Sequence, residues 1–141
     1  MPAGYSSTPL ARKLGLKPGN RLVLVHAPAS WSVEGLPQHV SVVRRRSPRA
    51  DVLIAFFARL SDLEREVTVL SASIVPDGSL WLAWPRRAAG HVSDITDDGV
   101  RLAALPLGLV DVKVAALGDD WSGLKMVWRR ERRASLRRSE G

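Results

Sequence analysis

The sequence contains no cysteine, which excludes disulfide bonds, thiolate metal sites and cysteine nucleophiles. It has no run of about 18 or more apolar residues, the length that a helix needs to cross a bilayer. No charged start followed by an apolar core and a cleavage site is visible, so we expect no signal peptide, no membrane association and a cytoplasmic location. The three histidines, His26, His39 and His91, share no metal-like spacing, and no metal site is predicted.

Lysine is also scarce, with 4 Lys against 17 Arg. We interpret the arginine bias as the mark of a GC-rich genome, which lowers the weight of any single arginine. The net charge is +7, and residues 129–141, with six Arg and two Glu, contribute +4 of it. The rest of the chain carries only +3, a weaker indication of nucleic-acid binding than a uniformly basic domain would be.

The length of 141 residues is sufficient for one domain with its own core. We predict a flexible segment at residues 1–8, a single domain at residues 9–130 and a basic disordered tail at residues 131–141. Within the tail, the motif RRASL resembles the substrate pattern of basophilic serine kinases. This makes Ser135 a candidate phosphorylation site.

Apolar runs predict the strands of a sheet. The run RLVLV is nearly continuous, as is typical of a strand buried on both faces of a parallel sheet. Strands are expected at residues 21–25, 40–44, 52–57, 79–83, 110–117 and 124–128. The segment 110–117 carries Asp111 and Lys113 and is expected near an edge. The loop 118–123 has the length of a hairpin connection to the last strand.

Three helices are expected between these strands. The first is capped by Ser7 and Thr8 and stops near Leu14. The second begins with the capping box SDLE at residues 61–64, and the third begins near Asp94 or Thr96 and runs to about residue 105. The apolar stripe of the second helix consists of Leu63, Val67, Leu70 and Ile74. A turn at Asp77-Gly78 follows that helix. This order predicts a compact three-layer Rossmann-like α/β fold, a mostly parallel sheet with helices on both faces and a C-terminal antiparallel hairpin.

The segments LGLKPGNRLVLV, VLIAFF and SIVPDGSLWLAW, followed by the hairpin, resemble the order of segments in class I S-adenosylmethionine-dependent methyltransferases. The motifs GYSSTPLARKLGL, DGSLWLAWPRR, ALPLGLVDVKVAA and DDWSGLKMVWRR resemble, more closely and through about residue 130, a family of short actinobacterial proteins of unknown function. The first resemblance implies a methyltransferase-like fold. The second family has no established activity to carry over.

The chain departs from the methyltransferase pattern after its first strand. That pattern needs an acidic residue and two or three glycines, so that the backbone approaches the cofactor closely. The matching positions here are Leu24, His26, Pro28 and Ser30. Residues 26–51 are too few for two helix–strand units, and the acidic residue expected for a ribose would fall among the arginines 44–46. We therefore expect no bound cofactor.

Ligands of open α/β sheets bind outside the carboxyl ends of the strands. The candidate ligand-binding residues there are Arg86, Arg87, His91, His26, Trp84 and Trp121. Guanidinium groups beside indole rings hold an anion next to a flat group. The alternative is that the arginines form a solvated rim and the tryptophans pack the ends of the sheet. No catalytic residue is predicted: the aspartate pairs 97–98 and 119–120 have structural roles, and Ser122 lacks a nucleophile elbow.

The function expected from the sequence is a non-catalytic binding module for a partner protein or a small anionic ligand at the carboxyl ends of the strands. The first alternative is a divergent S-adenosylmethionine-dependent methyltransferase, which the lost glycines disfavour. The second alternative is a nucleic-acid-associated protein that uses the basic tail and the arginines 44–46, although no nucleic-acid-reading motif is present.

Overall fold

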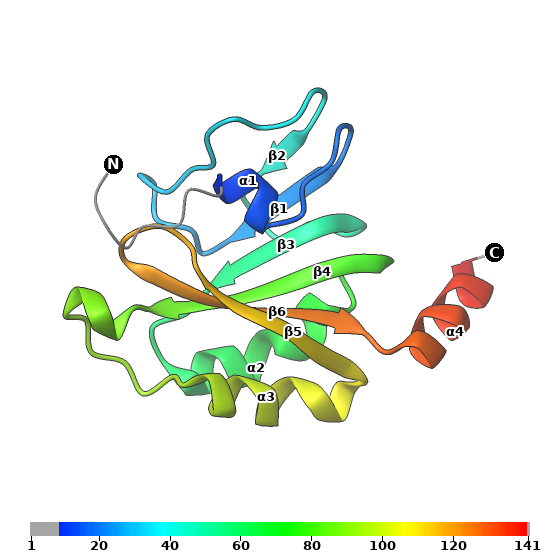
Figure 1. The fold of residues 1–141 in the computed structure, drawn as a ribbon. Coiled ribbons are helices and arrows are strands. Elements are labelled where there is room, and N and C mark those ends of the chain that lie inside the picture. The colour runs from blue at the N-terminus through cyan, green and yellow to red at the C-terminus, as the bar shows by residue number, and fades with distance from the viewer. Residues whose placement is uncertain (1–8, 141) are drawn as a thin grey trace.

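The computed structural model describes residues 9–140, and a six-stranded sheet forms its centre (Figure 1). The strands are β1 (Arg21–Val25), β2 (Ser41–Val43), β3 (Ala50–Phe56), β4 (Ile74–Pro85), β5 (Leu109–Ala116) and β6 (Trp121–Trp128). Their order across the sheet is β2-β1-β3-β4-β6-β5. The first four strands are parallel, and β6 runs antiparallel to both β4 and β5. The predicted mostly parallel sheet with a terminal antiparallel hairpin is confirmed, and β5 lies at an edge as expected.

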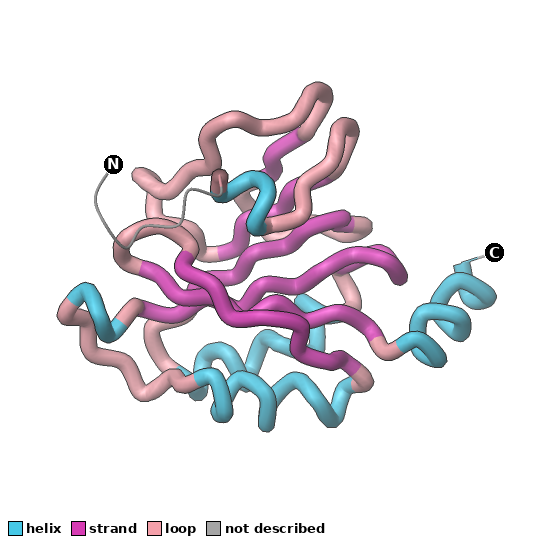
Figure 2. The backbone as a smooth tube through the Cα atoms, viewed as in Figure 1, coloured by secondary structure: helices cyan, strands magenta, loops and turns pink. Residues whose placement is uncertain are grey.

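Helices lie on both faces of the sheet, but unequally. The α-helices are α1 (Leu10–Lys13), α2 (Leu60–Ser71), α3 (Asp97–Ala104) and α4 (Arg130–Glu140), and the short 3₁₀ turns are η1 (Arg87–Ala89) and η2 (Leu105–Leu107). Figures 1 and 2 show α2 and α3 side by side beneath the sheet, with α1 and the loop after β1 on the opposite face. The proposed cap at Ser7 and Thr8 lies outside the described residues.

The sheet separates two apolar cores because side chains alternate along each strand. In β4, Leu80 and Leu82 join the core under α2 and α3, whereas Trp81 and Ala83 join the core under α1. From α2, the stripe that reaches the first core consists of Leu63, Val67 and Leu70. Ile74, expected as the next member of the stripe, is buried but opens β4.

The connections between the first three strands contain no helix, as the residue count predicted. Residues 26–40 join β1 to β2, and residues 44–49 join β2 to β3. Three non-glycine residues in these connections have positive φ angles: His26 (60°), His39 (63°) and Arg49 (62°). Such values are uncommon for residues with a Cβ and occur at sharp reversals of the chain.

The predicted capping box of α2 is wrong. The N-cap residue is Arg59, two residues before the predicted Ser61, the helix begins at Leu60, and Arg59 makes no side-chain capping bond. Instead, the Leu60 N–H donates to Asp94 Oδ1 at 2.8 Å, so a residue from a distant loop caps the helix. For α3 the predicted cap Thr96 is confirmed, because its Oγ1 accepts the Gly99 N–H at 3.0 Å.

The predicted turn at Asp77-Gly78 is also wrong, because both residues lie inside β4. The pairing of β3 with β4 shifts register at this point, so the segment is an irregularity in the strand. A Cβ on Gly78 would lie 2.9 Å from the Ala50 carbonyl oxygen. Glycine therefore permits the close approach of two backbones rather than a chain reversal.

Residues 130–140 form α4 where a disordered tail was expected. The segment is rich in Arg and contains Ala and Leu, all of which favour helices. Its Leu136 packs against the core under α2 and α3, and its Arg132 guanidinium lies 5.7 Å from the centroid of the Trp128 ring. Arg137 pairs with Asp77 of β4. No helix among residues 9–140 has the length and apolar character that crossing a membrane requires.

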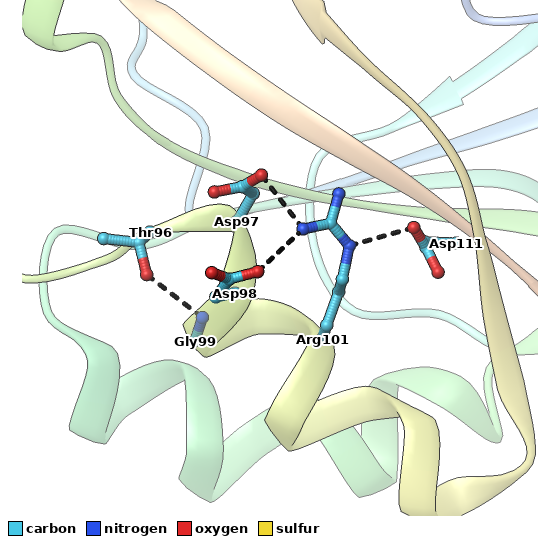
Figure 3. A network of polar contacts seen from close by, with 6 residues as sticks. All are labelled: Thr96, Asp97, Asp98, Gly99, Arg101 and Asp111. Atoms are coloured by element: carbon cyan, nitrogen blue, oxygen red, sulfur yellow. Dashed lines mark hydrogen bonds and ion pairs between the residues drawn. The ribbon is translucent and has the colours of Figure 1, made fainter.

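A polar network ties α3 to the edge strand β5 (Figure 3). Arg101 Nη1 donates to Asp97 Oδ2 at 2.9 Å and to Asp98 Oδ1 at 3.0 Å, and its Nε donates to Asp111 Oδ2 at 2.9 Å. The hydrogen bonds to Asp111 and Asp97 raise the pKa of Arg101, and the Arg101 guanidinium lowers the pKa of Asp111. Asp97 and Asp98 lie in the first turn of α3, as the sequence predicted, and they also bind Arg101, which it did not predict.

Candidate functional site

The carboxyl ends of β1, β3 and β4 form the edge at which a ligand was expected. His26 directly follows β1, and its Nε2 lies 2.9 Å and 3.0 Å from the two carboxylate oxygens of Glu66 on α2. Its ring also contacts Phe57 edge to face, with centroids 5.6 Å apart. The imidazole therefore links the end of β1 to α2.

The β1–β2 loop, residues 26–40, crosses this edge and is held by polar contacts. The Trp31 Nε1–H donates to the Leu117 carbonyl at 2.8 Å, and its ring contacts Phe56 edge to face. Arg44, which follows β2, donates from Nη1 to the Trp31 carbonyl at 3.1 Å and from Nη2 to the Pro28 carbonyl at 2.9 Å. The sequence associated Arg44 only with the nucleic-acid alternative and gave no sign of this role.

At the ends of β4 and β6, the expected anion-binding groups contact the turn between β5 and β6. The Arg86 N–H donates to the Asp120 carbonyl at 2.8 Å, and its Nη1 donates to the Asp119 carbonyl at 3.3 Å. His91 Nε2 lies 2.9 Å from Asp120 Oδ1. The structure thus brings Arg86 and His91 together, but around an acidic turn. Arg87 is exposed in η1, and its side chain makes no hydrogen bond or ion pair within residues 9–140.

The two tryptophans of the predicted site lie on opposite faces of the sheet. Trp84 is 7% exposed and belongs to the core under α2 and α3. Trp121 begins β6 rather than lying in the loop, and it packs edge to face on Phe56 in the core under α1. Both tryptophans therefore pack the sheet. Ser135, the predicted phosphorylation site, is half-buried within α4.

A cavity of about 550 Å³ lies between the β1–β2 loop and the turn after β5. Its lining residues are Pro9, Leu10, Ser30, Trp31, Ser32, Glu34, Gly118 and Asp119. None of the six predicted ligand-binding residues is among them. Within residues 9–140, neither Glu34 nor Asp119 forms an ion pair through its carboxylate, so the cavity has an acidic rim. This charge favours a cationic or hydrogen-bond-donating group over the anion that the sequence suggested. The described part of the chain contains no cluster of three or more side chains that could hold a metal ion.

No family model matches the chain, and no curated protein matches it. Among solved structures, a SAM-dependent methyltransferase from Aquifex aeolicus is similar, with a TM-score of 0.52, 14% identity, and coverage of 82% of this chain and 86% of that one. A TehB-like SAM-dependent methyltransferase from Corynebacterium glutamicum is similar with a TM-score of 0.50, 10% identity, and coverage of 90% and 91%. The chain therefore has a methyltransferase-like Rossmann fold.

The residues after β1 do not fit S-adenosylmethionine in the manner that the methyltransferase resemblance implies. A glycine loop is required there, but the loop begins with His26 and continues through Pro28, which has no N–H to donate. The Pro28 carbonyl is itself occupied by Arg44. The first glycine of the loop is Gly35, ten residues beyond the last residue of β1, so no glycine directly follows the strand.

Proposed function

We propose that this chain is a non-catalytic, methyltransferase-like binding module that engages a partner protein at the carboxyl edge of its sheet. The observation that carries the proposal is that the β1–β2 loop is held in place by hydrogen bonds of Arg44 and Trp31. Arg44 and Trp31 fix this loop in the place where a cofactor loop would stand, and no backbone cradle remains. The cavity beside it is bordered by Glu34 and Asp119, which suit a basic side chain of the partner.

A direct test uses charged probes of opposite sign on the full chain. Arginine amide should shift the indole N–H resonance of Trp31, which lines the cavity, whereas glutamate at the same ionic strength should not. The double variant Glu34→Gln/Asp119→Asn should lose the response to arginine amide while keeping its fold. Equal responses to both probes, or a response unchanged in the variant, would remove the basis for a cationic site.

A divergent S-adenosylmethionine-dependent methyltransferase is the second candidate. The similar solved structures are SAM-dependent methyltransferases, which favours this candidate more directly than it favours a binding module. Calorimetric titration with S-adenosylmethionine separates the two candidates. We expect no binding in the low-micromolar range, because the cradle is absent. A low-micromolar affinity, or methyl transfer to a co-purified protein, would establish the second candidate instead.

A further inference from the structure

Three of the four lysines of the chain, Lys17, Lys113 and Lys125, lie on or beside the face of the sheet that α1 covers. Lys113 of β5 and Lys125 of β6 are directly opposed in the antiparallel pair. The Lys113 Nζ lies 5.9 Å from the centroid of the Trp81 ring, and the Lys125 Nζ lies 3.6 Å from the place that a Cβ on Gly15 would take. The chain thus places two like charges side by side, which destabilises a sheet unless something compensates.

No carboxylate compensates these charges within residues 9–140. Neither Lys113, Lys125 nor the adjacent Lys17 forms an ion pair there. Burial and the neighbouring charges of Lys113 and Lys17 lower the pKa of Lys125. The ammonium groups therefore repel one another.

The surface beside Lys17 and Lys125 is hollow. A cavity of about 380 Å³ has a polar lining of Lys17, Asn20, Asp51, Asp77, Ser79 and Lys125. Its two carboxylates already have partners: Asp51 Oδ2 accepts the Arg21 N–H at 2.7 Å, and Asp77 pairs with Arg137. Lys17 and Lys125 are the cationic groups of this lining, and neither has an ion-pair partner within residues 9–140.

A second hollow adjoins the first and extends the basic surface. It has a volume of about 400 Å³, shares Gly15 and Lys17 with the first cavity, and adds Arg12 from α1. The two hollows together have room for more than one phosphoryl group.

We propose that Lys17, Lys113 and Lys125 form a binding site for a phosphate-bearing anion, with a diphosphate as the best match to the adjoining hollows. Lysine ammonium groups bind phosphate as point charges, and an anion between Lys113 and Lys125 turns their repulsion into attraction. None of the three lysines lines the carboxyl-edge cavity, and the second hollow borders that cavity only through Pro9, so the proposal does not rest on the function proposed above. The phosphoryl groups could belong to inorganic diphosphate or to a nucleoside diphosphate.

The test is calorimetric titration of the full chain with sodium pyrophosphate and, separately, with adenosine diphosphate, at an ionic strength held constant with sodium chloride. Lys125→Met should weaken binding by about ten-fold or more, because a charge-assisted hydrogen bond is lost. The matched control is Lys13→Met, which removes the one lysine that lies outside the cluster and should change the affinity less than about two-fold. A preference for adenosine diphosphate would identify a nucleotide as the source of the phosphoryl groups, and equal affinity would identify the diphosphate alone.

Thermal unfolding without ligand supplies a second signature. Since Lys125→Met removes the repulsion and the desolvated charge, the unliganded variant should melt at or above the wild-type temperature while it loses the stabilisation that pyrophosphate gives. If Lys125→Met fails to fold, the exposed Lys113→Gln provides the same comparison. Wild-type binding no tighter than that of chloride, or equal weakening in Lys125→Met and Lys13→Met, would overturn the proposal.

Discussion

Arg44 fastens the β1–β2 loop, and its replacement by alanine tests that role. The guanidinium donates to the Trp31 and Pro28 carbonyls at 3.1 Å and 2.9 Å. A hydrogen bond from a charged group contributes about 1.5–3 kcal/mol, and exposure to solvent places these two at or below the low end of that range. We therefore expect Arg44→Ala to lower the free energy of unfolding by about 1–2 kcal/mol. For a chain of this size, that corresponds to a fall in Tm of roughly 3–8 °C.

The neighbouring arginine provides a matched control. Arg45 is exposed and makes no hydrogen bond or ion pair within residues 9–140, so Arg45→Ala removes the same charge without releasing the loop. Its Tm should stay near that of the wild type, since exposed substitutions usually change stability by no more than about 0.5 kcal/mol. Arg44→Lys should behave more like Arg44→Ala than like the wild type, because an ammonium lacks the planar fork that reaches two carbonyls.

Circular dichroism gives the Tm of each variant, and hydrogen exchange reports on the loop itself. Amide protons of residues 27–40 should exchange faster in Arg44→Ala than in Arg45→Ala, whereas those of β3 should not differ. If the Tm of Arg44→Ala lies within roughly 1 °C of the Tm of Arg45→Ala, and exchange in the loop is unchanged, Arg44 does not hold the loop in place. That result would also weaken the proposed function, which depends on a fixed loop.

Three further predictions concern stability. Gly123→Ala should cost about 1–3 kcal/mol in urea unfolding, because its Cβ would lie 2.9 Å from Leu117 Cγ; an unchanged midpoint would mean that this core yields freely. Deletion of α4 should lower the Tm by a few degrees through the loss of Leu136, whose burial is worth at most about 1.5–3 kcal/mol, and an unchanged Tm would show that the helix does not dock. Because Arg101 lowers the pKa of Asp111, this carboxylate stabilises the fold above its ordinary pKa and loses that effect as the pH falls through the lower folded value. The advantage of the wild type over Asp111→Asn should be constant above about pH 5 and shrink below about pH 4, and a gap that widens on acidification would contradict this sign.

Local patterns predicted the strands well because each strand carries its own signal. The apolar run Arg21–Val25 coincides with β1, since continuous burial on both faces requires apolar residues throughout. The count of residues 26–51 predicted that the crossovers lack helices, because chain length limits what fits between parallel strands.

Contacts between residues far apart in the sequence could not be predicted from local sequence patterns. Asp94 caps α2 across 34 residues of sequence, and Trp31 reaches Leu117 across 86. The motif SDLE is a sound local signal for a helix start, but Asp94 satisfies the first amide and the helix begins at Leu60 instead. Such partners become visible only when the register of the sheet is known.

For the candidate site, the topology predicted the edge of the sheet at which a residue lies but not the face to which its side chain points. Topology placed Trp84 and Trp121 at one end of the sheet, which is where they lie. Trp84 pairs with Ser122, however, so Trp121 is offset from it by one residue and points to the other face. Assigning Trp121 to a loop concealed this alternation and made the two rings look like walls of one pocket.

Arginine and lysine have different roles in this fold. The difference indicates which positively charged side chains are candidates for ligand binding. Arg44 and Arg86 bind backbone carbonyls, and Arg101 binds three carboxylates, so these guanidinium groups are occupied by the protein itself. Lys113 and Lys125 oppose each other across a strand pair without a carboxylate between them. A planar guanidinium binds several fixed acceptors at once, whereas an ammonium is a compact point charge, and the ammonium groups of Lys113 and Lys125 have no ion-pair partner within residues 9–140. Loss of a tethering arginine should therefore reduce stability, whereas loss of a clustered lysine should reduce binding and leave stability equal or higher.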